Sequence, residues 1–142
     1  MQIKNYTEEL LKTVLDFPEK IKKDEMKKAE KFVKSGAVEK NFEAVSIGMS
    51  VMAYINYKTG DKNSYRAYSI LNDAKYLAMS SNLYLAQKVN HFIFALMEFD
   101  EENFDDALDF LNNAKLIKIG EFEFDDKIRQ VKNVIEKAKQ KR

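Results

Sequence analysis

Acidic and amide side chains crowd into residues 100–106, "DEENFDD", and their oxygen atoms are of the kind that binds calcium. A calcium loop of the EF-hand type needs oxygen ligands on alternate residues and a Gly at its sixth position. Asn103 and Phe104 break that pattern, and the segment has no Gly. Acidic residues also favour the start of a helix, where they oppose its positive dipole end and cap free N–H groups. We therefore expect a helix start here and no metal site.

Catalytic chemistry has few candidates in this chain. His91 is the only histidine, so a two-histidine metal site is impossible, and no Cys is present to act as a thiol nucleophile. No Ser lies in a nucleophile-elbow context, so a serine triad around His91 has no partner. The segment "TGDKNS" has one Gly and lacks the second Gly and the Lys of a phosphate-binding loop. We expect no enzyme, no catalytic residue and no cofactor; a divergent enzyme centred on His91 is the remaining catalytic hypothesis.

The composition fits one helical domain over residues 1–142. Four Gly and one Pro are too few for many tight turns, and 45% hydrophobic with 33% charged residues is typical of a globular protein. The N-terminus lacks the pattern of a signal peptide, and no stretch of 18 apolar residues occurs. With a net charge of +1, no strong field favours nucleic acid or membranes. We expect a cytoplasmic protein with no membrane contact.

Seven helices are predicted from apolar spacing and from start and stop residues. Thr7 is expected to cap the first, Pro18 to end it or open the second, and Gly36 to stop the second. The expected later helices span about 37–58, 64–79, 83–99, 104–118 and 125–139, with Gly120 closing the sixth. The fifth is apolar nearly all round, which predicts a buried central helix.

An internal repeat relates three of these helices. "AYSILNDAK" from Ala67 and "ALDFLNNAK" from Ala107 share five residues at an offset of 40, and "AEKFVKSG" from Ala29 is a fainter copy. Each has a small residue, bulky residues three and four positions later, and a second small residue at the seventh position. Positions i, i+4 and i+7 share one helix face, where small residues let a neighbouring helix come close. Helix pairs of this kind stack to bury their faces.

The segment "FALMEFDEENFDDALDFLNNAK" resembles a tetratricopeptide repeat (TPR). The matches are Phe94–Ala95, Asn103–Phe104, Ala107, Leu111 and Ala114, and the preceding unit offers Met52–Ala53, Gly60–Asp61, Ala67, Leu71 and Ala74. The period of 38–40 residues exceeds the family's, and the family's Trp position holds His91. The resemblance implies an all-α fold of about seven antiparallel helices stacked as a short TPR-like solenoid or bundle. Its units would span about 6–36, 42–79 and 83–119, followed by a C-terminal capping helix at 122–140.

The resemblance also implies a groove lined by the first helix of each unit. Carried over to this sequence, the groove positions are Ile47, Ser50, Tyr54, Tyr57, Lys58, Val89, Phe92, Leu96, Phe99 and Asp100. Of these we expect Tyr54, Tyr57, Lys58, Phe92, Leu96, Phe99 and Asp100 to bind a partner. Alternatively, a terminal helix folds back and fills the groove.

Charge is distributed unevenly along the chain. Residues 98–126 hold eleven acids against two lysines, and residues 127–142 hold seven bases and one acid. Such an arrangement favours electrostatic steering of a partner or of a second copy. We therefore predict a non-catalytic protein–protein interaction module, an adaptor or scaffold that binds a peptide or helix of another protein or self-associates. The alternative is a nucleic-acid-associated protein that uses the Lys-rich helices 20–34 and 127–142.

Overall fold

The computed structural model describes residues 3–16, 23–59, 64–119 and 124–141. These residues form seven α-helices and no strand, so the chain is all-α as predicted. The helices are α1 (Ile3–Asp16), α2 (Lys23–Val38), α3 (Phe42–Thr59), α4 (Ser64–Ser80), α5 (Tyr84–Asp100), α6 (Phe104–Leu116) and α7 (Asp125–Gln140).

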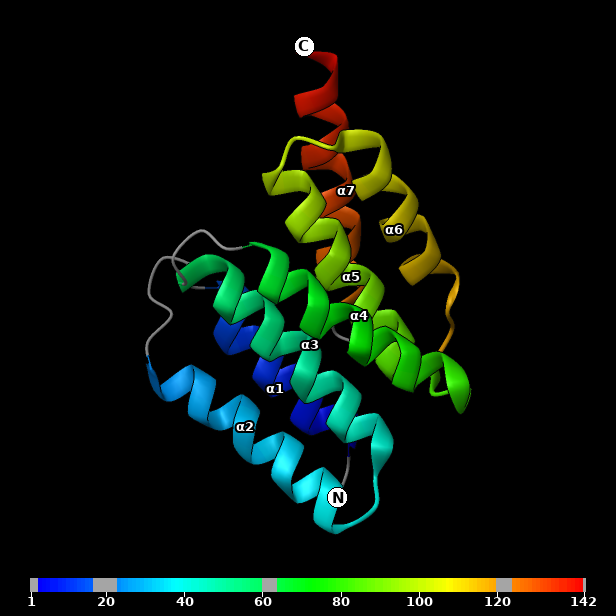
Figure 1. The fold of residues 1–142 in the computed structure, drawn as a ribbon. Coiled ribbons are helices and arrows are strands. Elements are labelled where there is room, and N and C mark those ends of the chain that lie inside the picture. Colours follow the sequence, from blue (N-terminus) through cyan, green and yellow to red (C-terminus); the bar gives the residue numbers. More distant parts are fainter. Residues whose placement is uncertain (1–2, 17–22, 60–63, 120–123, 142) are drawn as a thin grey trace.

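The helices stack in chain order, with the two termini at opposite ends of the molecule (Figure 1). Helix α3 packs against α2 on one side and against α4 and α5 on the other. Helix α5 packs in turn against α6, and α6 against α7, while α1 rests on α3 and α2. The two central helices therefore have neighbours on several sides, whereas α7 contacts mainly α6.

One core cluster contains buried side chains from all seven helices. Helices α3 and α5 supply most of it, and the buried face of α5 includes Val89, Phe92, Ile93, Phe94 and Met97. The prediction that the apolar fifth helix is central is thus confirmed. Helices α1 and α7 add Leu10, Leu11, Ile128 and Ile135 at the two ends of the stack.

The small residues of the repeated stretches are buried between helices. Ala29, Ala67, Ala74, Ala107 and Ala114 have no exposed surface, and Gly36 is buried as well. The bulky residues at the fourth position, Leu71 and Leu111, are also buried. The equivalent residue of the first stretch, Val33, is only half-buried, so the likeness in burial is complete for the Ala67 and Ala107 stretches alone.

Glycine is needed where α2 crosses α3. A Cβ atom placed on Gly48 would lie 2.5 Å from Val33 Cγ2 and 3.2 Å from the Ala29 carbonyl oxygen. A Cβ on Gly36 would lie 2.9 Å from Ala44 Cβ. The contacts of 2.5 and 2.9 Å are shorter than two carbon atoms tolerate, so a side chain at either glycine would require its neighbours on the facing helix to shift.

Several predicted helix ends were wrong. Thr7 is not a cap: it lies inside α1, where its hydroxyl donates to the Ile3 carbonyl at 2.7 Å. Gly36 does not stop α2, because it is needed for packing on α3 and the helix continues to Val38. The third helix consequently starts at Phe42, not at residue 37. Pro18 and Gly120 lie outside the described residues.

The starts of α5 and α6 are stabilised in different ways. The Glu43 carboxylate on α3 accepts hydrogen bonds from the backbone N–H groups of Leu85 and Ala86, at 3.1 and 3.3 Å. This carboxylate caps α5 from a neighbouring helix, since Leu83 at the cap position has no suitable side chain. The first turn of helix α6 contains Asp105 and Asp106, whose negative charges interact favourably with the positive end of its dipole. The helix start predicted for "DEENFDD" is therefore present. The cap residue Asn103 makes no side-chain hydrogen bond to the helix, so the expected capping of free N–H groups is not seen there.

Candidate partner-binding surface

Two of the residues predicted to bind a partner are part of the core. Tyr54 is 5% exposed and Phe92 is 1% exposed, and the groove positions Ile47, Ser50 and Val89 are similarly buried. These positions face neighbouring helices, which corresponds to a filled groove and not to an open one. Tyr54 and Phe92 therefore stabilise the fold and are not accessible to a partner in this structure.

The remaining predicted residues gather where α3 and α5 end. Tyr57 donates a hydrogen bond to Glu101 Oε1 at 2.6 Å, and Tyr68 of α4 donates to Glu98 Oε1 at 2.9 Å. Lys58 forms an ion pair with Asp100 and also lies over the ring of Tyr54. We call Tyr57, Lys58, Tyr68, Glu98, Asp100 and Glu101 the end cluster.

The phenol groups of the end cluster are held in their neutral form. The pKa of Tyr57 is raised above its usual range, chiefly by partial burial and secondly by the hydrogen bond from the phenol to Glu101. Partial burial, then the bond to Glu98, raise the pKa of Tyr68 in the same way. Neutral phenols are hydrogen-bond donors, so this cluster joins α3, α4 and α5 through donor–carboxylate pairs.

Leu96 and Phe99 are half-buried and pack against the core. The ring of Phe99 lies 5.8 Å from the ring of Phe104, across the turn between α5 and α6. Tyr57, Lys58, Leu96, Phe99 and Asp100 are therefore partly exposed, but each makes contacts within the chain. Their role in binding a partner stays a prediction.

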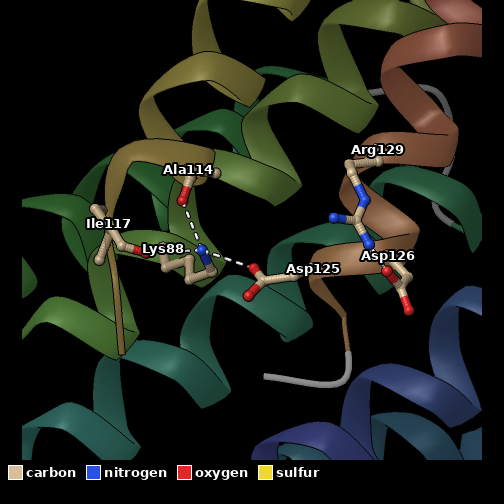
Figure 2. A network of polar contacts seen from close by, with 6 residues as sticks. All are labelled: Lys88, Ala114, Ile117, Asp125, Asp126 and Arg129. Carbon is tan, nitrogen blue, oxygen red and sulfur yellow. Dashed lines mark hydrogen bonds and ion pairs between the residues drawn. The ribbon is translucent and has the colours of Figure 1, made fainter. Parts of the chain in front are cut away.

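A buried lysine joins three segments at the other end of α5 (Figure 2). Lys88 is 2% exposed, and its Nζ donates to the carbonyl oxygens of Ala114 and Ile117, both at 2.8 Å. The same nitrogen lies 2.9 Å from Asp125 Oδ1 at the start of α7. The ammonium therefore supplies hydrogen bonds to carbonyls at the end of α6, and its positive charge interacts favourably with the negative end of the α6 dipole. Its role is to join α5, α6 and α7.

A second set of buried polar side chains lies between α3, α4 and α5. Ser46 donates to the Ala74 carbonyl at 2.7 Å, and the Asn90 side-chain amide donates to the Leu71 carbonyl at 3.1 Å. Asn90 Oδ1 has no hydrogen-bond partner although it is buried. These side chains bond backbone carbonyls of α4 and fix the register between α4 and its neighbours.

An exposed stripe on α4 was not predicted as a site. We call Tyr65, Ser69, Asn72, Tyr76 and Met79 the outer stripe. Tyr65 is 80%, Tyr76 75% and Met79 54% exposed, and they lie on the face opposite the buried Ala67 and Ala74. Stripe members follow one another at intervals of four and three residues, and this spacing could have revealed a second, uncharged face on the helix.

A groove of about 650 Å³ lies between α1 and α2. Tyr6, Leu10 and Phe32 provide its apolar lining, and Glu9, Lys28, Lys31 and Glu39 provide the charged part. The groove forms because α1 and α2 contact one another far less than α3 and α4 do. Its charges are balanced, so they indicate no preference for an anionic or a cationic ligand.

The basic residues of α7 are in part neutralised by acids. Lys139 is paired with Asp105 of α6, and Arg129 with Asp126. The described part of the other Lys-rich helix, α2, carries interleaved acidic residues. Phosphate binding needs several unpaired bases on one surface, and this pairing reduces their number on α7.

His91 has the properties of a packing residue. Its ring is half-buried and lies 6.1 Å from the ring of Phe110, and its Nδ1 has no hydrogen-bond partner. Burial and the nearby Lys75 lower the pKa of His91 below its model-peptide value. Among the described residues, no three His, Asp or Glu side chains are grouped closely enough to hold a metal ion.

No protein-family model, curated protein or solved structure matches this chain. Within the described part of the chain, no helix combines the length and apolarity needed to cross a membrane.

Proposed function

We propose that this chain is a non-catalytic protein–protein interaction module, a short TPR-like helical stack that binds a helix of another protein. The outer stripe of α4 is the observation that carries the proposal. One third of the residues in this chain are charged, yet none of the five stripe positions is. Tyr and Met are enriched in protein interfaces, and the stripe exposes two Tyr and one Met.

The spacing of the stripe fits a helical partner. Intervals of four and three residues average 3.5, which is the repeat of helices that pack along one another in a left-handed crossing. Large and small side chains alternate along it, so that Ser69 and Asn72 leave room between Tyr65 and Tyr76 for side chains of the partner. A short extended peptide would not need contacts along four turns of helix.

The packing of the stack supports the TPR-like part of the proposal. Helices α3 and α4 form one antiparallel hairpin and α5 and α6 form the next, and the first helices of the two hairpins, α3 and α5, also contact each other. The end cluster lies close to the outer stripe, because Tyr68 of the cluster is one helical turn before Asn72 of the stripe on α4. Its acidic residues would lie beside a partner on α4 and steer a basic flank of that partner.

Photo-crosslinking in the source cells tests this function. We expect benzoylphenylalanine at position 76 to capture a discrete protein, and the same group at position 73, which is exposed on α4 beside the stripe, to capture none. Replacing Tyr65 and Met79 by Ser should then abolish the crosslink. Equal capture at both positions, or none, would contradict the proposal. A crosslinked product of twice the chain mass would indicate self-association, and a nucleic-acid adduct would favour the nucleic-acid alternative.

A further inference from the structure

Within the described part of the chain, helix α7 packs mainly on α6 and has an exposed side. Its buried residues, Ile128 and Ile135, point into the core, and its main neighbour is α6 (Figure 1). Each of α3 and α5, by contrast, is packed against helices that precede and follow it in the stack. A further helix added to the stack would therefore pack against α7.

The free side of α7 carries an apolar strip. Val134 is 54% exposed, and Val131 and Ala138 beside it are half-buried. At 3.6 residues per turn, both lie within about 60° of Val134 around the helix. This strip is contiguous with the core, since Val131 packs against the core cluster. We call the side of α7 that contains Gln130, Val131, Val134, Lys137, Ala138 and Lys141 the terminal face.

The charge on the terminal face has one sign. Lys137 and Lys141 are exposed beside Val134, and Lys127 is partly buried on the same side. Two acidic residues of α7 lie away from this face, since Asp125 bonds Lys88 and Glu136 is on the far side from Val134. Asp126 lies at the edge of the face in the first turn of α7, where it pairs with Arg129. An apolar strip bordered by lysines and by no acid on its own face complements an apolar strip bordered by acids.

We infer that the terminal face binds an acidic amphipathic helix of another protein, which occupies the next position in the stack. The helix would place small or branched apolar residues against Val131, Val134 and Ala138. Its Glu or Asp residues would flank that strip and lie opposite Lys137 and Lys141. This site is separate from the outer stripe of α4, so an experiment can refute either proposal without refuting the other.

Fluorescence anisotropy with a labelled, hydrocarbon-stapled helical peptide tests the inference on the full chain. The probe carries a Leu and Ala stripe flanked by Glu, and its control carries Lys at every Glu position. We expect the Glu peptide to bind at least about tenfold more tightly than the Lys peptide, and less tightly as salt is raised. Equal binding of both peptides, or binding of neither, would overturn the inference.

Variants locate the binding surface. Val134→Asp should weaken binding of the Glu peptide at least about tenfold, and the Lys137→Glu/Lys141→Glu double variant should reverse the preference between the two peptides. Glu136→Gln is the control, because Glu136 is exposed on the side of α7 far from Val134; it should leave the preference between the two peptides unchanged. Circular dichroism establishes that each variant is folded.

Unchanged binding by the folded Val134→Asp variant would refute the site. Sedimentation velocity supplies the other decisive outcome. A wild-type dimer that becomes a monomer on Val134→Asp substitution would show that a second copy occupies this face, which would overturn the assignment to an acidic partner. A monomeric wild type that binds the Glu peptide supports the assignment.

Discussion

Lys88→Met should destabilise the protein, because it removes a charged donor from a buried site while keeping most of the apolar volume. The Lys88 ammonium donates to the Ala114 and Ile117 carbonyls and contacts Asp125. Met retains the aliphatic stem but offers no donor, so both carbonyls at the end of α6 lose a partner. The perturbation therefore acts on the junction of α5, α6 and α7 and not on core packing.

The expected loss follows from the environment of each contact. Hydrogen bonds to a charged group contribute about 1.5–3 kcal/mol each. The variant also avoids the cost of burying an ammonium, which offsets part of that loss. The Asp125 side chain is 44% exposed, so it regains water when its partner is removed and adds little to the cost. We expect a net loss of about 2–3 kcal/mol in the free energy of unfolding.

Urea denaturation followed by circular dichroism measures this loss. Lys115→Met is the matched control, because Lys115 is exposed on α6; its effect should stay within about 0.5 kcal/mol. Amide hydrogen exchange should also quicken at the start of α7 in Lys88→Met. A variant as stable as the wild type would refute the reasoning, since water would then satisfy the carbonyls or the desolvation cost would cancel the bonds.

Four further predictions use the same denaturation assay. Gly48→Ala should cost about 1–3 kcal/mol, because its Cβ would meet Val33, and no loss would mean that α2 and α3 are less closely packed. Ala107→Leu should cost a similar amount by overpacking the helix contact, whereas a neutral result would contradict the repeat register. Glu43→Ala should cost about 0.5–2 kcal/mol through loss of the α5 cap. The pKa of His91 is lowered on folding, so the unfolded chain binds its proton at higher pH. Stability should therefore fall as pH drops below about 6.5, and His91→Phe should weaken that dependence.

The helical architecture could be predicted because its signals are local. Apolar spacing and the scarcity of Gly and Pro identified all seven helices of the described chain. The Ala67 and Ala107 stretches identified the faces that pack most closely. Helix ends were less predictable, since they depend on tertiary contacts. Gly36 reads as a stop in isolation, but it lies inside α2 because α3 leaves no room there for a side chain.

The surface could be predicted only in part, because exposure depends on which neighbouring helix covers each face. Tyr54 and Phe92 were assigned to a groove by family resemblance, and the packing of the stack buries them. Tyr65 and Tyr76 lie in a helix that was predicted from its apolar spacing, but they were not assigned to a face of that helix. Their angular separation from Ala67 and Ala74 would have distinguished the two faces.

Two hydrogen bonds join corresponding positions of the two hairpins, although their donor residues are of different types. In the α3–α4 hairpin Ser46 donates to the Ala74 carbonyl, and in the α5–α6 hairpin Lys88 donates to the Ala114 carbonyl. The donors are 42 residues apart and the acceptors 40, so the α3–α4 hairpin has two more residues between donor and acceptor than the α5–α6 hairpin.

Gly48 and Asn90 form a second pair of positions that, like Ser46 and Lys88, are 42 residues apart. Gly48 packs on the Ala29–Val33 turn of α2, and Asn90 bonds the Leu71 carbonyl of α4. Ser and Lys, or Gly and Asn, have little in common chemically, so sequence comparison does not relate them. Their positions in the fold do relate them. Ser46 and Lys88 each bond a carbonyl of the following helix, and Gly48 and Asn90 each contact the backbone of the preceding one. Lys88 is longer than Ser46, and its extra reach extends to Ile117 and to Asp125 at the start of α7. The same contact that fixes one hairpin thus also attaches the last helix to the stack.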